Sequence, residues 1–371
     1  MKYLLSILCI LLFSCGSKTP SEKAIVTPLN IPEKGEKVKL KWAKNFEITH
    51  FQDYTQLDIL VNKNKRHTYF LSKTRKEVNS KSTITIPTTS VASASCVYTK
   101  MFDELGKLDY IKAIDYKYYI YSQKINTYVK TNNVLEFEAR DNLDIEGLFN
   151  LSPDVLLTWT SNDSKKNLEK LEQLGIPIVF MASYKEKHPL ARAEWIKCIA
   201  LFADEFKKAS EYFNEVEKKY LALAQNREEK TSILINAPYG ANWHFPPQKS
   251  FITHQLADAN LKVNHLDSLS DKVSIHSLET VLSLHQDDDI WINPSYYSSI
   301  SEMKKADKRF EHFKAFKDKQ VYNCMKRKVE QGGIDYWELG VIRPDLILKD
   351  LIHIQKNDHP DSLFFFNKLE P

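Results

Sequence analysis

Short apolar runs alternate with helical segments between residues 90 and 181, and this alternation constrains the fold more than any other feature of the sequence. The runs are bounded by polar or turn residues, as is typical of strands buried in a sheet; they lie at 90–92, 111–114, 155–159 and 178–181. Helices are predicted at about 95–105 and 164–174, because Gly106 and Gly175 suit the left-handed end of a helix. Such an alternation predicts a parallel sheet covered by helices.

The stretch from 204 to 227 contains neither glycine nor proline and predicts one long helix. Apolar residues recur in it at helical spacing, namely Phe206, Ala209, Phe213, Val216, Tyr220 and Leu223. A second set of elements follows, with strands predicted at 233–235, 290–292 and 321–322 and helices at 251–259, 277–284 and 343–354. A hairpin is predicted before the first set, at 57–61 and 68–71. The sequence therefore predicts an α/β fold of two lobes, each with a central, mostly parallel sheet, bridged by one long α-helix.

A short internal repeat supports this division into two lobes. The segments 146–154 and 279–287 share a first Glu, apolar residues three and five positions later, and an Asp eight positions later. Each segment leads into a strand that carries a tryptophan, Trp159 in the first half and Trp291 in the second. The alternative is chance similarity between two short segments, but their corresponding positions favour duplicated lobes.

The N-terminus predicts export and lipid attachment. An apolar run from 3 to 13 is too short to span a bilayer as a mature helix, but it fits the apolar region of a signal peptide. It ends in Leu12-Phe-Ser-Cys15, which resembles a bacterial lipobox, so Cys15 is the predicted lipidation site. The alternative is an ordinary secretory signal with a chance cysteine. Residues 1–14 are then the signal peptide, and residues 15–40, rich in Ser, Lys, Pro and Glu, are a flexible tether.

Composition excludes several functional classes. The 52 basic and 48 acidic side chains give a net charge of +4 with no dense basic tract, which argues against nucleic acid as a partner. Only nine glycines are present, and neither G-x-G-x-x-G nor a P-loop occurs, so no nucleotide cofactor is predicted. The chain lacks G-x-S-x-G, H-E-x-x-H and C-x-x-C, so we expect neither a hydrolase nor a metal site.

Several segments, in their order along the chain, resemble one family. They are 88–106, 145–159 with its Leu-Ser-Pro-Asp-Val-Leu-Leu, 168–179 and Arg192-Ala-Glu-Trp-Ile. These segments are similar to the periplasmic substrate-binding lipoproteins of ABC importers for iron-siderophores and cobalamin, over roughly residues 40 to 355. The resemblance implies an N-terminal lobe (41–203), a rigid inter-lobe helix (204–228) and a C-terminal lobe (229–371), with a ligand cleft between the lobes.

The resemblance also implies partners and a location. The ligand would be an iron-siderophore, cobalamin or haem-like complex, delivered by a monomeric protein to ABC permease subunits. The protein would be periplasmic and held to a bacterial membrane by lipid on Cys15. Glu146 and Glu279 match the family's permease-docking glutamates, although a Glu is also favoured at a helix N-terminus by the helix dipole alone.

The loops expected to line the cleft are aromatic, which suits a bulky ligand. The ligand-binding candidates are Tyr116, Tyr118, Trp159, Tyr184, Tyr239, Trp243, His244, Tyr296, Tyr336 and Trp337. Arg192 is a further candidate, because its planar fork matches a carboxylate. The alternatives are that many of these aromatic residues pack in the lobe cores and that Arg192 forms a structural bridge, either with Glu194 or between the lobes.

Three other functional classes remain as alternatives. A binding protein for a free transition-metal ion would need converging His and carboxylate ligands, but the eleven histidines are scattered. An enzyme would need a reactive group, and the nearest acidic loop is Asp335-Tyr-Trp-Glu338, which we expect in the cleft. A structural surface lipoprotein would need neither two lobes nor aromatic loops.

Overall fold

The computed structural model describes residues 34–62, 64–74, 82–139, 142–159, 165–224, 230–264, 271–358 and 360–371. The predicted signal peptide, the lipidation site Cys15 and most of the predicted tether lie outside these residues.

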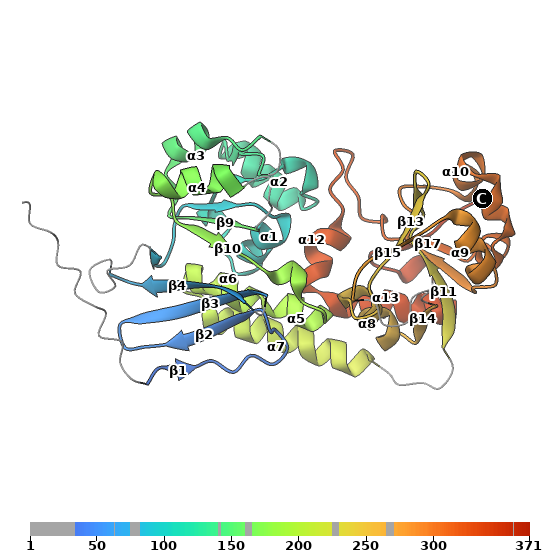
Figure 1. Cartoon of the computed structure of the whole chain (residues 1–371), viewed down its shortest axis with the longest axis horizontal. Helices are drawn as coiled ribbons and strands as arrows, with labels where there is room; N and C mark the ends of the chain where they lie inside the picture. The colour runs from blue at the N-terminus through green and yellow to red at the C-terminus, as the bar shows by residue number, and fades with distance from the viewer. Residues whose placement is uncertain are drawn as a thin grey trace, which may run out of the picture. The chain divides into compact units, whose positions relative to one another are not determined.

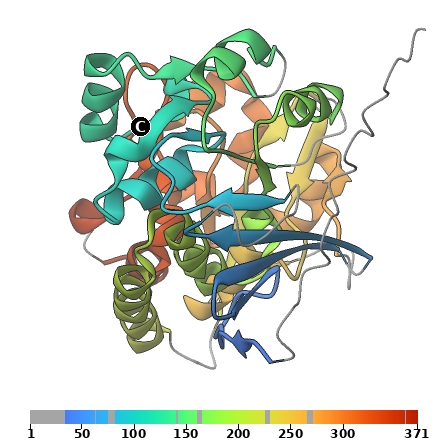
Figure 2. The ribbon, with the colours of Figure 1, turned by 90° about the vertical axis from the view of Figure 1, so that its left-hand side faces the viewer.

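A five-stranded sheet begins the described chain, in the order β1-β2-β3-β4-β5 (Figures 1 and 2). Its strands are β1 (Glu36–Lys37), β2 (Phe46–His50), β3 (Tyr54–Asn62), β4 (Lys65–Ser72) and β5 (Thr83–Thr85). The pairing is antiparallel except between β4 and β5, and β3–β4 is the predicted hairpin. The rest of this sheet was not predicted, and β1 corrects the end of the tether, because Glu36 and Lys37 pair with β2.

The N-terminal lobe contains a second sheet that is parallel throughout, in the order β10-β9-β6-β7-β8. Its strands are β6 (Val91–Ser93), β7 (Ile111–Ile114), β8 (Leu135–Glu136), β9 (Val155–Thr158) and β10 (Ile178–Phe180). The helices of this part are α1 (Cys96–Glu104), α2 (Gln123–Thr131), α3 (Ile145–Leu151) and α4 (Lys165–Gln173), with 3₁₀ turns η1 (Leu108–Tyr110), η2 (Lys117–Tyr119) and η3 (Ser183–Lys185). Side chains of α3 and α4 pack on one face of the sheet, and those of α1 and α2 pack on the other. The four predicted strands are confirmed.

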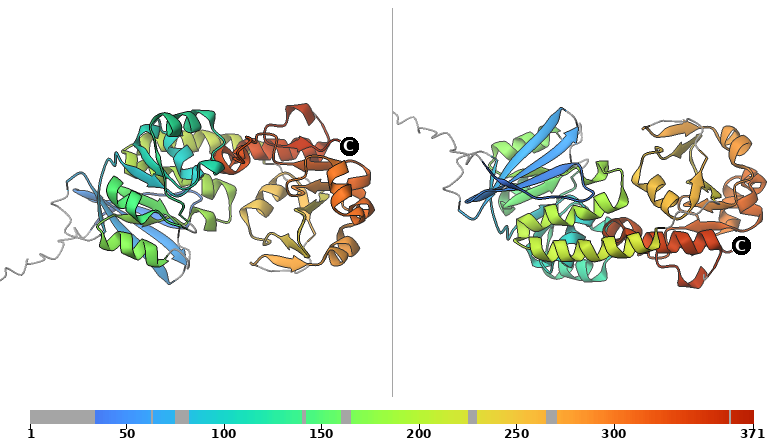
Figure 3. Two further views of the ribbon diagram at one scale, coloured as in Figure 1. Left: turned by 90° about the horizontal axis from the view of Figure 1, so that it is seen from above. Right: turned by 90° about the horizontal axis from the view of Figure 1, so that it is seen from below.

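Three consecutive helices connect the two lobes: α5 (Pro189–Glu194), α6 (Ile196–Ala203) and α7 (Phe206–Leu223). The long helix predicted at 204–227 is α7, which packs against both α6 and α13 (Pro344–Lys356) (Figure 3). Ala209 and Phe213 of α7 lie in the core of the N-terminal lobe, whereas Val216 and Tyr220 lie in the core of the C-terminal lobe. One helix therefore contributes to both cores.

The C-terminal lobe contains a sheet in the order β14-β11-β16-β17-β18, parallel except for β18. Its strands are β11 (Thr231–Ile235), β14 (Leu261–Val263), β16 (Ile290–Ile292), β17 (Val321–Asn323) and β18 (Asn367–Lys368). Its helices are α8 (Phe251–Asp258), α9 (Leu278–His285), α10 (Ile300–Ala306), α11 (Lys314–Lys317), α12 (Asp335–Ile342) and α13, with η4 (Lys308–His312) and η5 (Pro360–Ser362). A small antiparallel sheet of β12 (Pro238–Tyr239), β13 (Asn242–Phe245) and β15 (Ser274–His276) completes it.

The two parallel sheets share a strand order, which supports duplication of the lobes. The succession β10-β9-β6-β7 corresponds to β17-β16-β11-β14, so each lobe repeats the same four-strand core with one different edge strand. The register nevertheless corrects the predicted repeat. Asp154 and Asp289 are the equivalent residues, since each directly precedes its strand. Each donates its backbone N–H to a carbonyl at the start of the neighbouring strand, that of Ser90 just before β6 and that of Ser232 in β11.

This register separates the two tryptophans of the repeat. Trp159 follows the end of β9, whereas Trp291 is the middle residue of β16 and is completely buried. The two residues therefore do not occupy equivalent positions in their lobes.

Glu194 fastens the first residues of the fold to α5. Its buried carboxylate accepts hydrogen bonds from the backbone N–H groups of Lys41 (3.0 Å), Trp42 (2.7 Å) and Ala43 (2.9 Å). It also accepts one from the Nζ of Lys197, at 2.7 Å, and that lysine is itself buried. The predicted alternative of an Arg192–Glu194 bridge is wrong, because these four donors occupy the carboxylate.

We expect Glu194→Ala to lower the free energy of unfolding by about 3 kcal/mol, because it leaves a buried lysine and three backbone donors without their acceptor. Urea denaturation of the chain from Lys18 onward, followed by tryptophan fluorescence, measures this change. Glu215→Ala is the control, since that exposed glutamate forms an i,i+4 pair with Lys219 at the surface, where ion pairs contribute little to stability. Equal losses in both variants would contradict the role of Glu194.

Candidate functional site

A cavity of about 460 Å³ lies beyond the carboxyl ends of β6, β7, β9 and β10. The chain proceeds from β6 to β7 on one side of the sheet and from β9 to β10 on the other, so β6 and β9 flank a topological switch point, where open α/β sheets bind ligands. The lining residues are Ser93–Thr99, Ile114–Tyr116, Tyr119, Ile120, Trp159, Ser183, Tyr184, Arg192 and, from α12, Trp337. We call this cavity the strand-end pocket.

Five of the predicted ligand-binding residues lie together in the strand-end pocket: Tyr116, Trp159, Tyr184, Arg192 and Trp337. Four of them are aromatic, and each comes from a different segment, after β7, β9 and β10 or from α12. Tyr119 adds a fifth ring, since it packs edge-on against Tyr116 with ring centroids 5.8 Å apart. These rings provide the rigid apolar surface that a bulky ligand needs.

Arg192 is the cation of the pocket, and its side chain has no hydrogen-bond or ion-pair partner among the described residues. It belongs to α5, which begins at Pro189 and whose N-cap His188 accepts the Leu190 N–H through Nδ1, at 3.1 Å. The guanidinium lies over the ring of Phe251, 4.1 Å from its centroid, and its Nε atom is buried without a hydrogen-bond partner. Burial lowers the pKa of Arg192 to about 10, so it remains positively charged at neutral pH.

Small polar residues form the strand-end side of the pocket. Ser95 caps α1 by accepting the Val97 N–H, so the positive end of this helix dipole faces the cavity. The hydroxyl of Thr99 donates to the Oγ of Ser93 at 3.0 Å, and the hydroxyls of Tyr98 and Ser183 lie 3.0 Å apart. Sequence reasoning did not identify Ser95 or Thr99 as residues of the site, because serine and threonine near the end of a strand carry no distinctive signal.

Cys96 lines the pocket as a thiol and not as a thiolate. Burial, followed by the nearby Glu338 carboxylate, raises the pKa of Cys96 to about 12. Its Sγ lies 3.9 Å from the carbonyl oxygen of Trp337, a distance suited to a weak S–H hydrogen bond. A protonated thiol is neither a nucleophile nor a good metal ligand. The other described cysteines, Cys198 and Cys324, are buried and free.

Apart from Trp337, the candidates of the C-terminal lobe lie outside the strand-end pocket, and two of them are core residues. Trp243 is completely buried; it stacks on Trp291 and donates its Nε1–H to the carbonyl of Ile235, at 2.8 Å. This corrects its prediction as a cleft residue. Tyr336 is also buried, against Phe365 and Phe366.

The remaining candidates are at least partly exposed but do not line this pocket. Tyr239 is 86% exposed and Tyr296 is 74% exposed. His244 is partly buried in β13. Tyr118 is exposed and packs edge-on against Tyr119 instead of facing the cavity.

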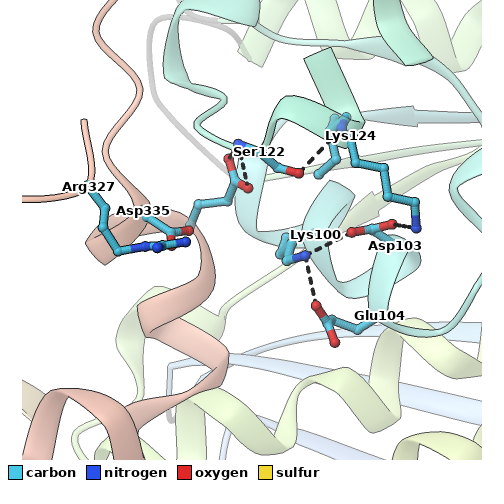
Figure 4. A network of polar contacts seen from close by, with 9 residues as sticks. Lys100, Asp103, Glu104, Ser122, Lys124, Arg327 and Asp335 are labelled. Carbon is cyan, nitrogen blue, oxygen red and sulfur yellow. Dashed lines mark hydrogen bonds and ion pairs between the residues drawn. The ribbon is translucent and has the colours of Figure 1, made fainter. Parts of the chain in front are cut away.

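The segment Asp335–Glu338, predicted as a loop, is the first turn of helix α12. Glu338 is completely buried, and its carboxylate accepts hydrogen bonds from the backbone N–H groups of Tyr121 (2.6 Å) and Ser122 (3.2 Å). Figure 4 shows the polar contacts around Ser122 and the ion pair of Arg327 with Asp335, at 2.6 Å. Trp337 extends into the pocket from this anchored turn.

Glu146 and Glu279 occupy corresponding, exposed positions. Each lies in the first turn of its helix, α3 after the N-cap Asp144 and α9 after the N-cap Ser277. Glu279 forms an ion pair with Arg309. Both carboxylates are therefore at the surface of their lobes.

The described residues form neither a metal-binding cluster nor a membrane-spanning helix. No three or more His, Cys, Asp or Glu side chains converge in a way that could hold a metal ion within the described part of the chain. The helices of that part are also too short or too polar for any of them to cross a bilayer.

Comparison with known proteins identifies a family and a fold. The sequence model of the family described as "Periplasmic binding protein" matches residues 91–327. An uncharacterized lipoprotein of Methanocaldococcus jannaschii is 24% identical, over 98% of this chain and 94% of that protein.

Two solved structures show the same fold. A possible iron-binding (periplasmic solute-binding) protein of Staphylococcus epidermidis aligns with a TM-score of 0.57 at 20% identity, covering 72% of this chain and 98% of that one. A periplasmic haem-binding protein of Vibrio cholerae aligns with a TM-score of 0.55 at 16% identity, covering 71% and 98%.

Proposed function

Because the chain belongs to the periplasmic binding protein family, we propose that it captures an anionic iron-siderophore, cobalamin or haem-like complex and delivers it to an ABC permease. The observation that carries the proposal is the strand-end pocket, in which aromatic rings accompany one guanidinium that has no hydrogen-bond or ion-pair partner among the described residues. The similar fold of proteins described as iron-binding and haem-binding supports this ligand class. In this proposal the protein binds its ligand and catalyses no reaction on it.

The chemistry of the pocket favours a planar, anionic ligand. Tyr116, Trp159 and Trp337 offer apolar faces that lose few rotamers on binding. Arg192 offers a planar pair of donors to a carboxylate or catecholate oxygen, and α1 adds the positive end of its dipole. A bare metal ion would need several oxygen, nitrogen or thiolate ligands, and the residues lining this pocket offer no such set.

Closure of the C-terminal lobe over the ligand is part of the proposal. Trp337 is the residue of the C-terminal lobe that lines the pocket. We propose that Tyr239, His244 and Tyr296, which are at least partly exposed, approach the ligand only when the lobes close. The cleft between the lobes would then extend the strand-end pocket.

Membrane attachment and docking complete the proposed role. We propose that lipid on Cys15 anchors the protein in the periplasm, consistent with a lipoprotein relative. The exposed Glu146 and Glu279, one on each lobe, would meet basic residues of the permease subunits.

Titration with ligands tests the binding function directly. Haem, a ferric siderophore or cobalamin, added to the chain from Lys18 onward, should quench tryptophan fluorescence saturably, because Trp159 and Trp337 line the pocket. Trp159→Phe with Trp337→Phe should remove most of the quenching. Trp243→Phe is the control and should retain it, since that indole is in the core. No saturable response to any of the three ligands would contradict the proposal.

Arg192→Gln should weaken binding of the ligand found in that titration by about 10- to 100-fold, because a charged hydrogen-bond pair is lost. Isothermal titration calorimetry measures the dissociation constant. Lys187→Gln is the matched control, since this exposed lysine lies five residues away and pairs with Asp271 at the surface. Unchanged affinity in Arg192→Gln would remove the arginine from the site.

Glu146→Ala combined with Glu279→Ala should abolish ligand uptake by cells while leaving ligand affinity intact, because both carboxylates are exposed and lie outside the pocket. Uptake of radiolabelled ligand and affinity of the purified variant are measured together. Glu330→Ala, another exposed glutamate, is the control. Normal uptake in the double variant would disprove the docking role.

A further inference from the structure

Glu338 joins two segments that are 217 residues apart in the chain. Its carboxylate lies on α12 and accepts backbone hydrogen bonds from Tyr121 and Ser122, which follow η2. These N–H groups point at a side chain that is completely buried. The contact is therefore a specific anchor and not a flexible surface pair.

Close packing of the backbone reinforces this anchor. A Cβ atom on Gly333 would lie 2.3 Å from the carbonyl oxygen of Ile120, so only glycine allows the two chains to approach this closely. Arg327 lies over the ring of Tyr121, 5.0 Å from its centroid, while it binds Asp335. The residues 327–338 are thus fitted against residues 120–122.

The anchored residues are direct neighbours of pocket residues. Tyr119 and Ile120 line the pocket immediately before Tyr121, and Trp337 lines it immediately before Glu338. Any change in the Glu338 contact would move Trp337 relative to the aromatic residues of η2. The anchor therefore determines the width of the pocket between Trp337 and the aromatic residues of η2.

We propose that Glu338 is a positioning residue for the ligand site, forming a proton-dependent clamp that holds α12 against residues 120–122. The clamp itself is a property of the unliganded chain. Only its effect on ligand affinity rests on the proposed function.

The charges around Glu338 determine the direction of the pH dependence. Burial is the main cause that raises the pKa of Glu338 to about 7; Asp335 on α12 raises it too, whereas the two N–H donors and Lys100 of α1 lower it. Cys96 of α1 also lies near this carboxylate, as a neutral thiol. Lys100 is held by Asp103 and Glu104, as Figure 4 shows, and Asp335 is neutralised by Arg327.

Acid therefore strengthens the clamp. Once the clamp opens, water surrounds the carboxyl group and its pKa returns to the ordinary value near 4.5. The clamped form binds a proton more tightly than the open form, so lowering the pH from 8 to 5 shifts the equilibrium toward the clamped form by at least about tenfold. Raising the pH above 7 removes this stabilisation.

Hydrogen–deuterium exchange of the clamp amides tests the proposal in the unliganded chain. Protection factors on peptides covering residues 118–124 should rise at least tenfold between pH 8 and pH 5 in the wild type, after correction for intrinsic exchange rates. Glu338→Gln, which is neutral at every pH and keeps one carbonyl acceptor, should give a pH-independent protection factor. Glu338→Ala should give low protection throughout.

Two internal controls separate the clamp from general stability. Glu330→Gln, an exposed glutamate of the same segment, should keep the wild-type profile. Amides of β6 and β9 report on the core and should respond equally to pH in all variants. Two results would overturn the proposed clamp: a wild-type protection factor that does not change with pH, or a Glu338→Gln protection factor that changes with pH as the wild type does.

Ligand binding tests the positioning role separately. With haem as the probe, the ratio of wild-type to Glu338→Gln affinity should fall at least threefold from pH 6 to pH 8, and using the ratio cancels changes in the haem itself. A constant ratio together with the expected exchange profiles would overturn the positioning role. No haem binding by either protein would count against haem as the proposed ligand while the exchange result still decides the clamp.

Discussion

The burial of one helix in two hydrophobic cores is the constraint on which the rest of the structure depends. The apolar residues of α7 continue from the core of the N-terminal lobe, at Ala209 and Phe213, into the core of the C-terminal lobe, at Val216 and Tyr220. Unwinding α7 between them would expose apolar side chains on both sides, which opposes a free hinge at this point. The elements that form the pocket and the Glu338 contact are therefore held in place by α7.

The spacing of apolar residues in the sequence predicts most of the α/β architecture. Buried parallel strands are short apolar runs, and amphipathic helices repeat every three to four residues, so both could be recognised locally. The five-stranded N-terminal sheet was largely missed because its strands mix polar and apolar residues, with the apolar ones facing the core. The register of the repeat was also missed. The segment from Glu279 to Asp289 is two residues longer than that from Glu146 to Asp154, and no local sequence pattern indicates this insertion.

The site could be predicted only in part, since the same residue type serves both core and pocket. Trp159 and Trp243 each adjoin a strand in the sequence, but the first follows the carboxyl end of β9 while the second lies within β13 and faces the core. Tyr336 and Trp337 are neighbours on one helix and point in different directions, one into the core and one toward the pocket. The role of Glu338 depends on backbone groups more than 200 residues away, which no local pattern reveals.

Helix α5 contains two charged side chains with buried polar atoms, and they differ in how many hydrogen bonds those atoms form. Glu194 receives four hydrogen bonds, so the cost of removing its charge from water is offset within the chain. Arg192, two residues earlier, has only the face of Phe251 and leaves its Nε without an acceptor in the described structure. A buried donor without a partner destabilises the fold by about 1 to 3 kcal/mol. An anionic ligand in the strand-end pocket would place its negative charge beside this guanidinium, which would favour binding of an anion over a neutral molecule of similar shape.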